Sequence, residues 1–406
     1  MAKINQNFLN LKENYLFIEI GRKVREYTEK NPDKPVIRMG IGDVTQPLAP
    51  VVVEAMKKAA AEMGVKETFR GYEDSGRGYA FLREAVADYY KSFGVGVDPD
   101  EVLISDGAKT DCGNITDIFC EDNIVMVSDP VYPVYVDSNV MNGKNVVFAD
   151  ATEETGFSPV VPKGVKADII HLCSPNNPTG SVLTKEQIKK WVDYALENKA
   201  IIIYDAAYEI FISDSELPRS IFAVGDARKC AIEICSLSKT AGFTGTRCGY
   251  TVIPKELEFY DSDGNKYNVL KYWSRRQGSK FNGVSYITQR GAEAVFTPDG
   301  QRQTHEAVDY YMQNAKIMAD TFDALGVSYT GGKNSPYIWF KCGMPSWDFF
   351  DLLLSEKQIV GTPGAGFGKN GEGWFRLTAF GTKENTEEAM RRVRELIGNT
   401  NMRGNF

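Results

Sequence analysis

Four residues that could bind a phosphate and an aldehyde lie close together in the chain. Ser236, Ser238, Lys239 and Arg247 follow the apolar run 230–235 in a glycine-rich turn. Two hydroxyls and a guanidinium are suited to a phosphate dianion, and a lysine between them can form a Schiff base with an aldehyde. A phosphate and an aldehyde on one small molecule describe pyridoxal 5′-phosphate (PLP). By itself, such a turn would more often be a surface loop with a solvated lysine.

Polar side chains after other apolar runs could complete such a site. Asp205 ends the run 200–204 and could pair with the pyridine nitrogen, which would keep the ring protonated and able to accept electrons. Tyr208 and the amide of Asn177 could both reach the phenolic oxygen of the ring. Taken singly, each of these residues is of a type that is common at strand ends and in turns without a catalytic role.

Two further segments fit the same cofactor. The segment Ser105-Asp-Gly-Ala108-Lys109 passes from a predicted strand into a predicted helix. Backbone N–H groups at such a helix start, at Ala108 and Lys109, can bind an anion. Tyr132 follows another predicted strand and could stack on the pyridine face, although a lone aromatic residue is more often part of the core.

Composition excludes several classes of function. The 406 residues are 43% hydrophobic and carry a net charge of -7, which argues against nucleic acid or anionic membranes as partners. The N-terminus has no hydrophobic signal core, so we expect a cytoplasmic protein. Seven scattered cysteines do not resemble a disulfide framework. His171 and His305 are the only histidines, which leaves little for a zinc site or a histidine triad, so we expect no metal. Acid–base work would fall to Lys, Tyr, Asp or Glu.

The middle of the chain alternates short β-branched runs with amphipathic helices. This pattern predicts an α/β domain with a mostly parallel, seven-stranded sheet. The expected strands are 101–105, 124–128, 146–149, 167–173, 200–204, 230–235 and 249–253. The expected helices between them include 78–93 and 184–198, and the second opens with a capping-box pattern at Thr184. The candidate residues follow strand ends, where open α/β sheets bind ligands.

The pattern changes after Asn282 and predicts a smaller α+β domain. Helices are expected at 283–296, 304–325 and 386–398, and strands at 336–340 and 374–378. Near the N-terminus, the sequence of residues 11–27 predicts an extended arm that runs into a helix. We therefore expect an N-terminal arm with part of the small domain at 1–49, a large PLP-binding domain at 50–292 and a small C-terminal domain at 293–406.

Four motifs of this chain resemble those of the fold-type I aminotransferases in order and spacing. They are Ser-Leu-Ser-Lys with Arg247, Tyr-Asp-Ala-Ala-Tyr, Pro-Asn-Asn-Pro-Thr-Gly and Phe-Arg-Leu-Thr. The resemblance covers nearly the whole chain. It implies that Lys239 holds PLP as a Schiff base and moves a proton between the substrate and the cofactor, with Asp205 and Tyr208 assisting at the ring. Arg376 would clamp the substrate α-carboxylate. The implied phosphate ligands are Ser236, Ser238, Arg247, the Ala108 and Lys109 backbone, and Tyr72 contributed from one subunit to the site of the other, which makes the chain a homodimer.

A second set of motifs is similar to the LL-diaminopimelate aminotransferases. It includes Asn14-Tyr-Leu-Phe, Met39-Gly-Ile-Gly-Asp and Lys280-Phe-Asn-Gly-Val. This resemblance implies transamination between LL-2,6-diaminopimelate and 2-oxoglutarate, forming tetrahydrodipicolinate and glutamate, with the reverse direction serving lysine biosynthesis. The substrate would contact Tyr15, Gly42, Lys109, Tyr132, Asn177 and Arg376, together with Asn282 contributed across the dimer.

The loop 71–78 departs from this family. It reads Gly-Tyr-Glu-Asp-Ser-Gly-Arg-Gly, one residue longer than the family's pattern, and Ser75 stands where the family has a glutamate that helps bind the distal ammonium of the substrate. Glu73 or Asp74 could supply that charge from a rearranged loop. If neither does, the amino donor differs.

Other functions on the same fold stay open. An aminotransferase of broader specificity for aromatic, branched-chain or dicarboxylic amino acids would differ in its donor profile. A C–S β-lyase would release pyruvate from cystathionine. A ligand-sensing regulator would carry a DNA-binding domain ahead of the large domain, where we find only about fifty residues and an acidic overall charge.

Overall fold

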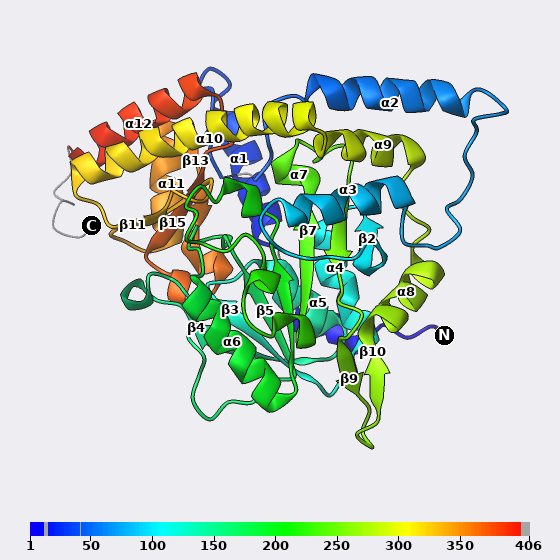
Figure 1. Cartoon of the computed structure of the whole chain (residues 1–406). Coiled ribbons are helices and arrows are strands. Elements are labelled where there is room, and N and C mark those ends of the chain that lie inside the picture. The colour runs from blue at the N-terminus through cyan, green and yellow to red at the C-terminus, as the bar shows by residue number, and fades with distance from the viewer. Residues whose placement is uncertain (12–14, 41, 399–406) are drawn as a thin grey trace.

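A seven-stranded sheet forms the centre of the molecule and gives it an α/β fold, as predicted (Figure 1). The structure is a computed structural model that describes residues 1–11, 15–40 and 42–398. The strand order is β2-β8-β7-β6-β5-β3-β4, in which β8 is antiparallel to both neighbours and the other pairs are parallel. The strands are β2 (Val102–Ser105), β3 (Ile124–Asp129), β4 (Asn145–Asp150), β5 (Ile169–Cys173), β6 (Ile201–Asp205), β7 (Ala231–Ser236) and β8 (Gly249–Val252). Each of them confirms a predicted strand.

Helices cover both faces of this sheet because successive side chains of a strand point to opposite sides. In β6, Ile202 and Tyr204 belong to the apolar cluster of one face, whereas Ile201 and Ile203 belong to that of the other. The first face carries α2 (Pro50–Met63), α3 (Ala80–Lys91), α6 (Lys185–Asn198) and α9 (Tyr286–Val295). The second face carries α4 (Ala108–Asn114), α5 (Pro133–Met141) and α8 (Val269–Lys280). Burial on both faces explains the continuous apolar runs in the sequence.

A smaller antiparallel sheet lies toward the C-terminus. Its order is β11-β12-β15-β14, and its strands are β11 (Tyr329–Gly331), β12 (Tyr337–Lys341), β14 (Thr362–Pro363) and β15 (Trp374–Thr378). The long helix α10 (Pro298–Leu325) runs above both sheets, and α11 (Ser346–Lys357) and α12 (Lys383–Gly398) complete this part (Figure 1). The two strands expected here from the sequence are confirmed. The two-stranded hairpin β9 (Glu258–Tyr260) and β10 (Lys266–Asn268) was not predicted.

The N-terminal segment lies against the C-terminal part of the chain. Helix α1 (Leu16–Lys30) follows a short 3-10 helix at Gln6–Asn10, and β1 (Ile37–Arg38) pairs in parallel with β13 (Ile359–Val360). On this pairing we propose that the first forty-nine residues belong with the small domain. The boundaries 49/50 and 292/293 stay predictions. Asn14 and Ile41, which belong to the predicted substrate motifs, lie outside the described residues.

Several helices begin at residues other than those expected. Helix α3 begins at Ala80 instead of residue 78, and α6 begins at Lys185 instead of residue 184. Helix α10 begins at Pro298, earlier than the predicted 304, because Thr297 caps it through Gly300 N and a proline is well suited to the first helical position. Helix α9 begins at Tyr286, later than the predicted 283, because the hydroxyl of Ser285 caps it. Helix α12 begins at Lys383 instead of residue 386.

The fold brings several candidate residues to one edge of the large sheet. Tyr132 follows the end of β3, Asp205 ends β6 and Ser236 ends β7. These strands are parallel, so their carboxyl ends open at the same edge, where such sheets bind ligands. Within the described ranges, the structure contains no helix of the length and apolarity needed to span a membrane.

Candidate active site

The amine of Lys239 is buried beyond the end of β7, in the short helix α7 (Leu237–Thr240). Its Nζ donates a hydrogen bond to the carbonyl oxygen of Gly42, which comes from the N-terminal segment. Burial lowers the pKa of Lys239 to about 8, and the positive charges of Arg247 and Arg376 act in the same direction. An amine that loses its proton this close to neutral pH can act both as a nucleophile and as a base.

The predicted phosphate ligands come together beside it. Ser236 Oγ accepts a hydrogen bond of 3.1 Å from the backbone N–H of Ser238, and Arg247 Nη1 donates to Ser238 Oγ over 3.2 Å. Gly107 precedes α4 with φ +130, and a Cβ built on it would lie 2.6 Å from Arg247 Nη2. Only glycine therefore fits at the start of α4, where Ala108 is the first helical residue. The result is a cradle of hydroxyl, guanidinium and backbone N–H groups.

Asp205 is buried and held by three donors. Its Oδ1 accepts from Ala207 N at 3.0 Å, and its Oδ2 accepts from the Tyr135 hydroxyl at 2.6 Å and from Cys112 Sγ at 3.6 Å. Tyr135 in turn stacks on His171, with ring centroids 5.1 Å apart. Burial raises the pKa of Asp205, although its hydrogen bonds oppose that effect. Asp205 forms no ion pair within the described part of the chain, which leaves room for a cationic partner.

Arg376 is a buried cation with neutral partners. Its Nη1 donates to Asn177 Oδ1 at 2.5 Å, and its Nη2 donates to the Gly40 carbonyl at 2.6 Å and to Thr362 Oγ1 at 3.2 Å. The side chain is 1% exposed, its Nε has no partner, and no carboxylate among residues 1–11, 15–40 and 42–398 pairs with it. Burial lowers the pKa of Arg376. An uncompensated buried charge is costly, so this geometry favours an anion-binding site over a structural role for Arg376 in a salt bridge.

The phenol of Tyr208 meets a second phenol. The hydroxyls of Tyr208 and Tyr337 lie 2.5 Å apart, and both residues are buried. A Cβ built on Gly42 would lie 3.2 Å from the Tyr337 hydroxyl, so a side chain at residue 42 would crowd this pair. Gly42 thus borders both Lys239 and Tyr337.

Three residues predicted to contact the substrate also lie together. Lys109 Nζ lies 5.2 Å from the centre of the Tyr15 ring. Burial raises the pKa of Tyr132 well above its ordinary value, and the neighbouring Tyr15 acts in the same direction. Tyr15 precedes α1 and Tyr132 precedes α5, so two distant segments supply this aromatic wall.

Comparison with known proteins assigns the family. The family model for aminotransferases of class I and II matches residues 34–393. This chain belongs to that family. It is 53% identical over 410 residues to the LL-diaminopimelate aminotransferase of Parabacteroides distasonis, covering 98% of this chain and 100% of that protein. It is 52% identical over 409 residues to the enzyme of the same name from Methanosphaera stadtmanae, covering 97% and 99%.

A solved structure extends the likeness to three dimensions. The L,L-diaminopimelate aminotransferase of Chlamydomonas reinhardtii matches with a TM-score of 0.91 and 41% identity, over 98% of this chain and 99% of that one. The fold-type I architecture implied by the resemblance is thereby confirmed. The protein is an aminotransferase, and membership of this family implies dependence on PLP.

The residues of this aminotransferase fit PLP. The cradle of Ser236, Ser238 and Arg247 suits a phosphate, because two hydroxyls and a guanidinium converge there. The buried carboxylate of Asp205 is suited to a protonated ring nitrogen. Lys239 has the lowered pKa that reaction with an aldehyde requires.

Two predicted site residues stand apart from this group in a single aminotransferase chain. Tyr72 is 83% exposed, and Asn282, which follows α8, is also exposed. Both were expected to complete the site of a second subunit instead of the site in their own chain. Their exposure is compatible with that prediction.

The loop that follows Tyr72 is closed by its own glutamate. Glu73 accepts hydrogen bonds from the backbone N–H groups of Ser75 at 2.9 Å, Arg77 at 3.2 Å and Gly78 at 3.2 Å. Partial burial raises the pKa of Glu73, but these hydrogen bonds outweigh that effect and lower it overall. The carboxylate of Glu73 therefore stabilises the turn of its own loop.

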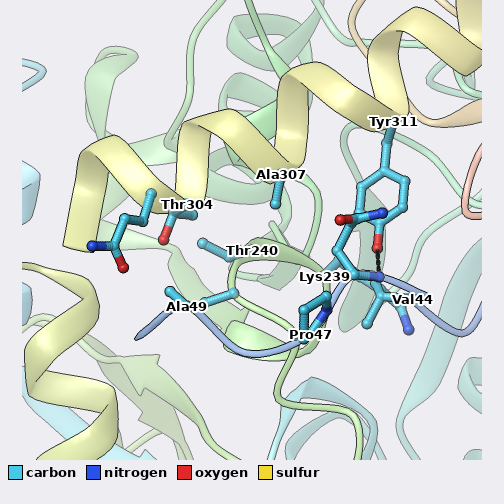
Figure 2. A pocket seen from close by; sticks show the side chains of 12 residues that line it. Val44, Pro47, Ala49, Lys239, Thr240, Thr304, Ala307 and Tyr311 are labelled. Atoms are coloured by element: carbon cyan, nitrogen blue, oxygen red, sulfur yellow. Dashed lines mark hydrogen bonds between the residues drawn. The ribbon is translucent and has the colours of Figure 1, made fainter. Parts of the chain in front are cut away.

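A narrow pocket of about 40 Å³ lies beside Lys239 (Figure 2). Figure 2 shows the loop that contains Val44 and Pro47 facing the helix that carries Thr304 and Tyr311. The Tyr311 hydroxyl accepts hydrogen bonds from the backbone N–H groups of Thr45 at 2.9 Å and Gln46 at 2.6 Å. This contact holds the N-terminal segment of the aminotransferase against the wall of its active site.

Sequence reasoning missed Tyr135, Tyr311 and Tyr337. Tyr135 lies three residues after Tyr132, in the first turn of α5, and the centroids of the two rings lie 5.8 Å apart, so this spacing could have pointed to Tyr135. Tyr337 lies in a predicted strand whose other aromatic residues are core, so nothing in its surroundings distinguished it. Tyr311 lies in a long amphipathic helix beside Tyr310, and its position in that helix did not distinguish it.

Proposed function

We propose that this aminotransferase transfers an amino group between LL-2,6-diaminopimelate and 2-oxoglutarate, with PLP as the cofactor. The observation that carries this proposal is the identity of more than half of the residues, over 98% and 97% of this chain, with two proteins named LL-diaminopimelate aminotransferase. The uncompensated charge of Arg376 supports it, because every amino acid substrate brings an α-carboxylate. We further propose that the physiological direction forms diaminopimelate for lysine biosynthesis.

Bound PLP would supply an aldehyde for the amino group and a ring that accepts electrons. Lys239 would hold the cofactor covalently through Nζ. Once released from it, the same amine would move a proton from Cα of the substrate. Its lowered pKa favours this, because about half of the amine is neutral near pH 8. Asp205 would keep the ring nitrogen protonated, since a buried carboxylate is poorly stabilised unless a cation lies beside it.

We propose that Arg376 and Asn177 bind the α-carboxylate end of the substrate. The two side chains already share a hydrogen bond of 2.5 Å. Tyr15, Lys109 and the Gly42 carbonyl would contact the distal end of the substrate. Lys109 already lies over the Tyr15 ring, and the Gly42 carbonyl accepts a hydrogen bond from Lys239. A dicarboxylate with two amino groups has complementary groups at both ends.

The distal ammonium requires a negative partner, and the loop 71–78 leaves one candidate. Glu73 is engaged by three backbone N–H groups of its own loop, and Ser75 carries no charge. We therefore propose that Asp74 supplies the carboxylate, across the interface of a homodimer in which each subunit lends Tyr72 and Asn282 to the site of the other.

The test is a half-reaction without an amino acceptor. LL-diaminopimelate added to the PLP-loaded protein should convert the cofactor rapidly to its amino form, which changes the absorbance, whereas phenylalanine and leucine should not. Conversion by those amino acids and not by LL-diaminopimelate would favour the broader-specificity enzyme. Release of pyruvate from cystathionine would favour the C–S β-lyase. Loss of all turnover in Lys239→Ala is expected, and substantial residual turnover would contradict the role of Lys239.

A further inference from the structure

The hydroxyls of Tyr208 and Tyr337 join the two sheets of the molecule. Tyr208 follows β6 of the large sheet, whereas Tyr337 opens β12 of the small sheet. The oxygens lie 2.5 Å apart, and the exposed fractions are 7% for Tyr208 and 1% for Tyr337. A hydrogen bond this short, between buried groups, constrains both rings.

The surroundings hold Tyr337 firmly. Its backbone N–H donates to Ser335 Oγ at 3.2 Å, and its carbonyl oxygen would lie 2.1 Å from a Cβ on Gly331. Its ring lies under the guanidinium of Arg376, 4.9 Å from ring centre to Cζ. Tyr337 therefore behaves as a fixed point from which Tyr208 can be oriented.

The number of protons that Tyr208 and Tyr337 can donate limits how Tyr208 can bind the cofactor. Each phenol carries one proton and can also accept a hydrogen bond. If Tyr208 gives its proton to the phenolic oxygen of the ring, its own oxygen must accept from Tyr337. A hydroxyl that accepts one hydrogen bond becomes a better donor in the next, because the two bonds polarise each other.

We propose that Tyr337 is a positioning residue for the aminotransferase reaction, whose hydroxyl orients Tyr208 and strengthens its donation to the phenolic oxygen of PLP. This inference rests on the proposed function. It adds a link from the small sheet to the cofactor that is separate from the contact between Arg376 and Asn177.

The test is the variant Tyr337→Phe, which removes the hydroxyl and keeps the ring beneath Arg376. Donation to the phenolic oxygen stabilises its negative charge and so lowers the pKa of the bound chromophore. We expect Tyr337→Phe to raise that pKa by roughly half a unit to one unit, and Tyr208→Phe to raise it further. The other groups that face the pair, which are Cys173, Tyr132, Asp205 and Arg376, are unchanged in these variants.

The double variant decides whether Tyr337 acts through Tyr208. In the Tyr208→Phe background, Tyr337→Phe should leave the chromophore pKa unchanged, because the group that it orients is gone. An equal rise in both backgrounds would overturn the proposal, and so would a PLP-loaded Tyr337→Phe protein with the parental pKa. If Tyr208→Phe itself leaves the pKa unchanged, the proposed role of Tyr208 fails as well, so the two failures can be distinguished.

Steady-state kinetics supply a second readout. Tyr337→Phe should lower kcat several-fold while KM for the amino donor stays within about twofold, because Arg376 keeps its partners. Tyr194→Phe is the matched control: its hydroxyl contacts Ala167 N and Val165 O in the outer part of the large domain. The control should retain the parental chromophore pKa and kcat. A rise in KM with kcat unchanged in Tyr337→Phe would instead indicate a substrate contact and overturn the positioning role.

Discussion

Arg376 Nη1 donates a hydrogen bond of 2.5 Å to Asn177 Oδ1, which connects the small sheet to the loop after β5 of the large sheet. The connection is buried and contains a full positive charge without a carboxylate among the described residues. The fold thus carries an unfavourable buried charge at the place where we propose that the substrate carboxylate binds. Strain and uncompensated charge of this kind are expected at functional sites.

Arg376→Lys should impair recognition of the substrate carboxylate. An ammonium cannot reproduce the planar pair of donors that a guanidinium offers to a carboxylate. We expect kcat/KM for every amino donor to fall by about 10²-fold. Arg394→Lys is the control, since Arg394 is an exposed arginine of α12 that donates a hydrogen bond to Thr321 Oγ1 at 3.0 Å. Parental kinetics in Arg376→Lys would rule out the carboxylate clamp.

Asp205 and Tyr135 should contribute to catalysis in unequal measure. Asp205→Asn removes the negative charge proposed to keep the ring nitrogen protonated, and we expect kcat to fall by at least 10²-fold. Tyr135→Phe removes one hydrogen bond from the same carboxylate, and we expect a fall of about five- to tenfold. Rapid-mixing kinetics of the half-reaction would measure both. Equal losses in the two variants would contradict this order.

Lys239 should make the stability of the cofactor-free protein depend on pH. Folding lowers the pKa of Lys239 from 10.5 to about 8, so between these values the unfolded chain binds more protons than the folded one. The contribution of Lys239 to the free energy of unfolding therefore rises with pH across that window, by about 3 kcal/mol in total.

Comparison with Lys239→Met isolates that contribution from the other groups that titrate. Urea unfolding at several pH values should show the variant more stable than the parent at pH 7, with the difference shrinking as the pH rises from 8 to 10.5. A difference that is constant with pH would show that the amine is not buried as described.

Substitutions of Glu73 and of Asp74 should change the KM values of the two substrates in different ways. Asp74→Asn should raise KM for LL-diaminopimelate by about tenfold and leave KM for glutamate unchanged, because only the first substrate has a distal ammonium. Glu73→Gln should affect both substrates alike, because its carboxylate closes the loop that carries Tyr72. If Glu73→Gln alone discriminated between the substrates, Glu73 and not Asp74 would be the recognition residue.

Subunit mixing should reveal shared active sites. Lys239→Ala and Tyr72→Ala homodimers should each be nearly inactive. A heterodimer of the two has one site with both residues intact, because Tyr72 acts on the neighbouring subunit. We expect about half of the parental activity from differently tagged, co-expressed and purified heterodimers. A heterodimer no more active than the two variant homodimers would show that each chain completes its own site.

Much of the fold could be predicted because each strand of the large sheet is recognisable from its own run of apolar residues. The large sheet is buried on both faces, so its strands appear as continuous β-branched runs that need no tertiary information to recognise. The hairpin at 258–268 was missed because its short strands are mostly exposed and lack that signal. The start of α10 was misplaced because the cap at Thr297 precedes the amphipathic part of the helix.

The candidate cofactor-binding residues could be identified from the sequence, because Ser236, Ser238, Lys239 and Arg247 lie in one short segment and Asp205 ends a recognisable strand. The side chains that support these residues became apparent only from the tertiary structure. Tyr135 reaches Asp205 across 70 residues, and Tyr337 reaches Tyr208 across 129. Contacts at such separations arise from the packing of helices and strands against one another, and no local pattern records them. For the same reason, the engagement of Glu73 within its own loop became visible only when the backbone N–H groups of the turn were in place.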